Sequence, residues 1–106
     1  MGNADDDPRR NRERIRRKAL AKTLAKMEHA LASELGEEKT SQVREYIEHH
    51  EFGLALDLLT ALAVAARVRP DAYAARVAAA ANRMGMTGPE DLSEWRAYLD
   101  ADRPGP

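Results

Sequence analysis

Residues 43–64, VREYIEHHEFGLALDLLTALAV, predict the fold of this chain more directly than any other stretch. In the first half, Val43, Tyr46, Ile47 and His50 follow the i, i+3, i+4, i+7 spacing of one helix face. In the second half, apolar residues fill nearly every position, as in a helix that is buried on almost all sides. The HHEFG corner between the halves therefore predicts two helices joined by a tight turn, which is a structural device without chemistry.

The flanking segments extend this pattern in both directions. Before the corner we expect one long helix over about 9–35 and a second over about 38–50, separated by Gly36. After the corner we expect a helix over about 52–67, a fourth that Pro70 opens and Gly85 ends, and a short fifth. Thr87 and Glu90 have the spacing of a capping box before that fifth helix. The predicted inward residues are Leu20, Leu24, Met27, Leu31, Leu35, Tyr73, Val77, Ala80, Ala81, Met84, Leu92, Trp95 and Leu99.

Composition and loop length together give the fold class. The chain has 106 residues, is rich in alanine and lacks an alternating strand pattern. We therefore predict an all-α fold, a small single-domain antiparallel bundle of about five helices with a long basic N-terminal helix. Residues 1–8 are expected to form a flexible leader and 102–106 a flexible tail. The helical domain is expected over 9–101, with a projecting basic arm over 9–18.

The sequence offers no recognisable catalytic, metal or cofactor site. There is no cysteine, which excludes disulfides and thiolate ligands, and no glycine-rich phosphate-binding loop. Glu45 and His49 are spaced as two metal ligands could be, but no second pair matches them. The EHHE run at 48–51 would fan around a helix axis. We therefore expect a protein that is not an enzyme and has no cofactor.

The N-terminus lacks an apolar signal region, and no apolar run is long enough to span a bilayer. We therefore expect a cytoplasmic protein without membrane contact.

The charge is distributed unevenly. The basic arm, residues 9–18, holds seven basic residues and one acidic residue, whereas the chain from Ala19 onward holds ten basic and fourteen acidic residues. Such an arm could bind phosphates, so a nucleic-acid-associated protein is one alternative function. Against it, the arm has no aromatic residue for base stacking. The candidate contacts are Arg9, Arg10, Arg12, Arg14, Arg16, Arg17 and Lys18.

Glutamates gather on the expected second helix and at its ends. Glu45 and Glu48 lie opposite the apolar stripe of that helix. The plain interpretation is a solvated helix face with weak Glu45–His49 and Arg44–Glu48 surface pairs. The functional interpretation is a negative surface that attracts a basic partner protein. The candidate partner-binding residues are Glu37, Glu38, Glu45, Glu48 and Glu51.

With these residues in view, the chain resembles the MafI family of small immunity proteins from polymorphic toxin systems. The likeness covers roughly 24–99, and its most specific part is V-R-E-Y-I-E-H-H-E-F-G-L-A-L-D-L-L. Weaker support comes from N-R-M-G-M at 82–86 followed by the helix around Trp95. Where family members often have glycine before the glutamate, this chain has His50, which takes a left-handed cap only at a steric cost. The residues that fit the pattern are Glu51, Gly53, Leu54, Ala55, Leu56 and Leu59.

The resemblance implies a protein that binds a cognate toxin domain, often a nuclease, and neutralises it by occlusion in the cytoplasm of the producing cell. It does not carry over individual contact residues. A further alternative is an adaptor that homodimerises through the first helix, because the leucine stripe of that helix is preceded by turns with little to bury.

Overall fold

A computed structural model describes residues 8–102 of the chain. Most of the expected leader and tail lies outside this range, although Pro8 and Asp102 themselves belong to helices. The described part is all-α, as predicted. Its elements are α1 (Pro8–Leu35), α2 (Glu37–Glu48), α3 (Phe52–Ala65), a 3₁₀ turn η2 (Pro70–Ala72), α4 (Ala74–Arg83) and α5 (Ser93–Asp102).

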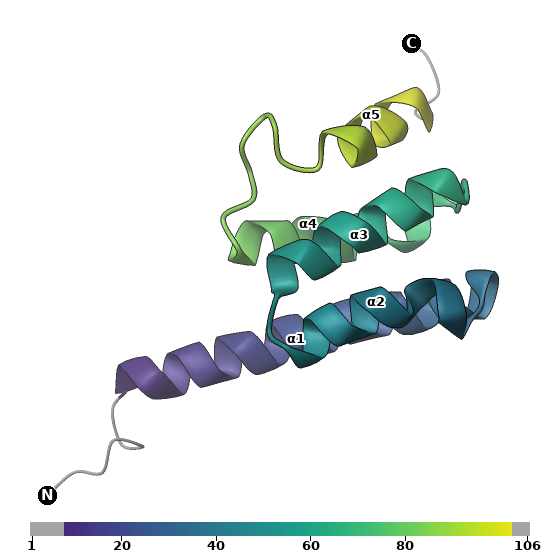
Figure 1. Cartoon of the computed structure of the whole chain (residues 1–106). Coiled ribbons are helices and arrows are strands. Elements are labelled where there is room, and N and C mark those ends of the chain that lie inside the picture. Colours follow the sequence, from purple (N-terminus) through teal and green to yellow (C-terminus); the bar gives the residue numbers. More distant parts are fainter. Residues whose placement is uncertain (1–7, 103–106) are drawn as a thin grey trace, which may run out of the picture.

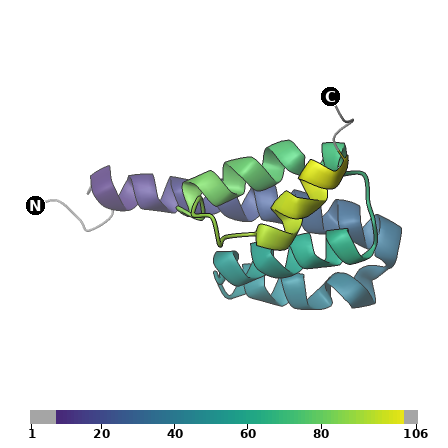
Figure 2. The same ribbon diagram turned by 90° about the horizontal axis from the view of Figure 1, so that it is seen from above.

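The helices run alternately in opposite directions, so the fold is an antiparallel bundle (Figure 1). The central element is α3, which packs against all four other helices. In contrast, α2 packs against just two of the described helices, α1 and α3, and these leave one side of it uncovered. Seen from above, α5 lies obliquely across the bundle, and the first turns of α1 extend well beyond the other helices (Figure 2).

The core forms where the apolar stripes of these helices meet. Leu24, Met27 and Leu31 of α1 are fully buried, as the leucine spacing predicted. From α3, Leu56 and Leu59 are fully buried as well. However, α3 is not buried on all sides, because Leu54 is half exposed. A helix with four neighbours still leaves a narrow strip to water, and Leu54 lies on it.

The α2–α3 corner differs from a continuous helix. Helix α2 ends at Glu48, and His50 adopts the left-handed conformation with a φ of 58°. The amide of His50 donates to the carbonyl of Ile47, and the amide of Glu51 donates to that of Tyr46. This is the Schellman arrangement, which satisfies carbonyls that a helix end leaves without donors. Because α2 ends before it reaches His50, the side chain of His50 is exposed. The prediction that His50 continues the apolar stripe of Val43 is therefore wrong.

The predicted capping box before the fifth helix is wrong. The amide of Gly88 donates to the Asp91 side chain at 3.0 Å, and Leu92 has a φ of 53°. A left-handed residue interrupts a right-handed helix, so α5 can begin only after Leu92. Thr87 and Glu90 therefore lie in a loop ahead of the helix.

The fourth helix also begins later than predicted. Pro70 opens only the η2 turn, and Tyr73, with a φ of −118°, separates that turn from α4. Further along, α4 ends at Arg83, and the left-handed Gly85 that follows closes this helix end, as the sequence indicated. The inward faces of both C-terminal helices are as predicted, since Tyr73, Val77 and Trp95 are buried.

Candidate functional site

Four glutamates form an exposed surface on α2, which we call the acidic face. With a helical turn of 3.6 residues, they fall within roughly 100° of the helix circumference. None of their carboxylates has an ion-pair partner among residues 8–102, so their charges are uncompensated there. The acidic face is a ridge along the helix, about 18 Å long, and is not a convergent cluster. Its members are Glu37, Glu38, Glu45 and Glu48.

The fifth predicted acid, Glu51, lies apart from this ridge. It follows the left-handed His50 and is the residue immediately before α3, where it is exposed and makes no side-chain cap. The structure thus groups four of the five predicted glutamates on one helix and places the last at the corner.

A polar contact that the sequence did not predict fixes α2 against α1. The carboxylate of Glu28, buried in α1, accepts hydrogen bonds from the Thr40 hydroxyl at 2.8 Å and from Arg44 Nε at 3.2 Å. Arg44 Nη2 also donates to the Glu37 carbonyl. Arg44 therefore pairs with Glu28 across the helices and does not form the surface pair with Glu48 that we expected.

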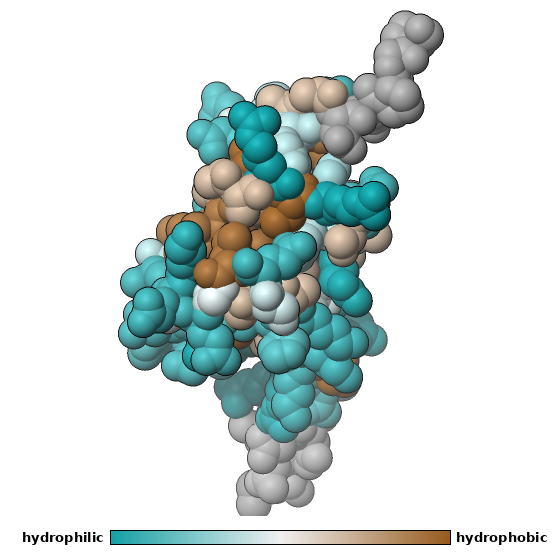
Figure 3. All heavy atoms as spheres, turned by 90° about the vertical axis from the view of Figure 1, so that its right-hand side faces the viewer, coloured by the Kyte–Doolittle hydropathy of each residue, from teal (hydrophilic) through white to brown (hydrophobic). Residues whose placement is uncertain are grey.

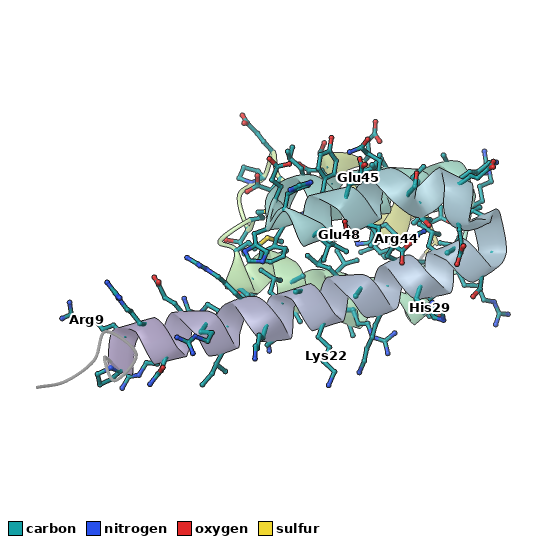
Figure 4. All side chains as sticks on the ribbon, turned by 60° about the horizontal axis from the view of Figure 1, so that its bottom comes forward. Arg9, Lys22, His29, Arg44, Glu45 and Glu48 are labelled. Carbon is teal, nitrogen blue, oxygen red and sulfur yellow. The ribbon has the colours of Figure 1, made fainter. Side chains whose placement is uncertain are left out.

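Figure 4, in which α1 lies lengthwise across the picture, shows how α1 and α2 are oriented. Arg44 lies between α1 and α2, whereas Glu45 points away from α1. Glu48 is one turn after Arg44 and shares its side of the helix. The acidic face therefore reaches from the outside of α2 to the edge that borders α1.

The basic arm is the exposed beginning of α1. Every residue from Pro8 to Lys18 is exposed, and Arg17 pairs with Glu13 at 3.9 Å on this surface. Part of the arm faces the α2–α3 corner, where it borders an open hollow of about 490 Å³. The hollow is lined by Arg10, Glu13, Arg14, Arg17, Lys18, Ala21 and His50. Four of the seven predicted basic contacts, Arg10, Arg14, Arg17 and Lys18, border this hollow. The other three, Arg9, Arg12 and Arg16, share the exposed start of α1 but do not border it.

The end of the molecule where α3 stops carries a hydrophobic area with hydrophilic side chains above and below it (Figure 3). Half-buried apolar side chains at the end of a bundle are ordinary on protein surfaces, so we assign this area no role.

Within the described residues, no group of three His, Asp or Glu side chains is placed to hold a metal ion. None of the helices in this part of the chain is long and apolar enough to cross a bilayer. Searches against protein-family models, curated proteins and solved structures find no match to this chain.

Proposed function

We propose that this chain is an immunity protein that binds a cognate polymorphic toxin domain, for example a nuclease, and neutralises it by occlusion. The single observation that carries the proposal is the acidic face, whose four exposed carboxylates have no ion-pair partner in the described chain. Uncompensated charge of one sign attracts an oppositely charged protein quickly and selects its orientation. A basic, nucleic-acid-binding toxin domain is a partner of that kind.

The way α2 is held supports the same function. One side of α2 packs on α1 and α3, and the buried Glu28 accepts hydrogen bonds from Thr40 and Arg44 of this helix. A surface on a fixed helix loses little conformational entropy when a partner binds. The acidic face is thus suited to a tight, preformed interface.

The segment that carries the family resemblance has a supporting role in this proposal. Ala55, Leu56 and Leu59 are fully buried in the core, so they do not contact a partner, and the exposed glutamates are left to bind it. This division between buried apolar residues and exposed charged residues also explains why the family resemblance lies in apolar residues and identifies no residue that contacts the partner.

A protection assay tests the proposed function. We expect a large secreted protein with a variable C-terminal domain to be encoded beside this chain. Expression of that domain alone should stop growth of the host cell, and co-expression of this chain should restore it. If the neighbouring domain is harmless, or if it kills equally well in the presence of this chain, the proposed function is wrong.

A further inference from the structure

We infer that the side of α1 facing away from α2 binds the phosphate backbone of duplex nucleic acid. We call this surface the outer face; it consists of Lys22 and Lys26 of α1, Arg76 of α4 and, at its edge, Lys18, which also borders the hollow beside His50. All four side chains belong to exposed residues. This surface lies on a different helix from the acidic face, so the inference does not rest on the proposed function.

Helix geometry arranges these cations in a row. The three lysines are spaced four residues apart, which places them on one side of α1 with a rise of about 6 Å between neighbours. Arg76 joins them from α4, since Lys22, Lys26 and Arg76 border one shallow hollow of about 540 Å³. The floor of that hollow includes Ala25 and Ala30, whose small side chains leave room for a phosphate strand to approach.

No acidic group of α1 neutralises this row. Glu13 pairs with Arg17, Glu28 is buried against α2, and Glu34 accepts a hydrogen bond from Tyr73. The four cations of the outer face themselves have no ion-pair or hydrogen-bond partner among residues 8–102. Lys22 also points to the opposite side of the molecule from Glu45 (Figure 4). The acidic face therefore does not cancel the positive potential of the outer face.

The length of α1 suits a duplex. A helix of 28 residues is about 42 Å long, whereas one turn of duplex DNA is about 34–36 Å. The basic arm continues the positive charge beyond the bundle, where none of the other helices in residues 8–102 stands in the way of a bulky partner (Figure 2). The cations of α1 lie between Arg9 and Lys26, a rise of about 26 Å, so this row of positive charge can follow a stiff polyanion over most of one turn.

Two other polyanionic partners fit less well. Single strands are held largely by base stacking on aromatic side chains, and α1 contains no Phe, Tyr or Trp. Membrane-surface helices insert a row of large apolar residues, and the only large apolar side chain of the arm, Ile15, stands alone with 68% exposure. A surface with positive charge, but without aromatic side chains for stacking or apolar side chains for insertion, favours contacts to the phosphate backbone of a duplex.

Fluorescence anisotropy of the full chain with a labelled DNA duplex of about two turns, over a salt series, tests the inference. We expect Lys22→Glu with Lys26→Glu to weaken binding about tenfold or more and to lower the salt slope by about 2. The matched control is Lys39→Glu with Arg69→Glu, which makes the same change in net charge at exposed positions away from the outer face. It should bind almost as wild type does.

Three results would overturn the inference. The first is no duplex binding at low salt, and the second is equal loss in both double variants. The third is a preference for another partner, seen as tighter binding to anionic phosphatidylserine vesicles or as a salt-sensitive dimer in sedimentation. Circular dichroism of each variant separates loss of binding from loss of fold.

Discussion

At the scale of single residues, two helix ends place a residue other than glycine in the left-handed conformation, which strains a side chain that has a Cβ atom. His50 follows the end of α2 and Arg67 follows the end of α3, with φ values of 58° and 55°. Both carry the paired amide–carbonyl hydrogen bonds of a Schellman motif, as the left-handed Gly85 does after α4. Gly85 could be predicted as a cap because glycine favours this conformation. The other two could not, since histidine and arginine give no such signal.

Replacing Arg67 with glycine should stabilise the protein. The left-handed conformation strains a residue with a Cβ atom, and the relief exceeds the entropy cost of glycine, so we expect a gain of roughly 0.5–1 kcal/mol in the free energy of unfolding. Urea unfolding measures it. The control is Ala66→Gly at the preceding right-handed position, which should destabilise instead. Equal changes in the free energy of unfolding for the two variants would show that Arg67 is not strained.

Tyr73 makes stability depend on alkaline pH. Burial raises the pKa of Tyr73 to about 12, and the hydrogen bond to Glu34 with its negative charge acts in the same direction. Because the folded pKa lies above the ordinary value of 10, this stabilisation is complete below pH 10 and is lost as the pH rises through 12. The loss should approach roughly 2–3 kcal/mol.

The comparison with Tyr73→Phe isolates this effect. The variant lacks the hydroxyl, so its free energy of unfolding should fall less steeply over the same pH interval, and tyrosinate absorbance should show one fewer late-titrating phenol. Parallel pH profiles for the two proteins would show that Tyr73 ionises as it does in an unfolded chain.

At the scale of elements, the spacing of apolar residues predicted which helices form, but backbone breaks decided where they begin. The stripe from Leu20 to Leu31 predicted the buried side of α1 because four-residue periodicity is a property of the helix itself. In contrast, α5 begins only after Leu92 because this residue adopts a positive φ, which no sequence pattern predicted. The Glu28 contact was missed for another reason, since pairing across two helices depends on their packing.

That contact should contribute measurably to the packing of α2 on α1. Thr40→Val keeps the side-chain shape and removes the hydroxyl that donates to the buried Glu28, so we expect a loss of roughly 1–3 kcal/mol. In a double-mutant cycle with Glu28→Gln, the two losses should not add, because both changes weaken one hydrogen bond. Additive losses would show that the two side chains act independently.

The basic arm should be dispensable for folding. Residues 8–18 are all exposed, and the buried stripe begins at Leu20. Removal of residues 1–18 should therefore change the free energy of unfolding by no more than about 0.5 kcal/mol, as thermal and urea unfolding would report. A truncated chain that unfolds much more easily would show that the arm takes part in the packed core.

At the scale of the whole molecule, charge is separated between the two helices that form one side of the bundle. The acidic face of α2 and the outer face of α1 point in different directions, as Glu45 and Lys22 show (Figure 4). The glutamates and the basic arm could be predicted because each is a cluster along the chain. Lys22, Lys26 and Arg76 could not be predicted as one surface, although the lysines are four residues apart, because Arg76 joins them only in the folded bundle.

The central claim is that the acidic face of α2 is the surface that binds the partner protein. The most direct measurement is the Kd of the purified toxin domain encoded beside this chain for wild type and for Glu45→Lys with Glu48→Lys. The matched control is Glu90→Lys with Asp100→Lys, which changes net charge equally at exposed positions outside α2. We predict affinity at least about tenfold weaker for the α2 variant and nearly unchanged for the control. Equal affinity for all three proteins would contradict the claim.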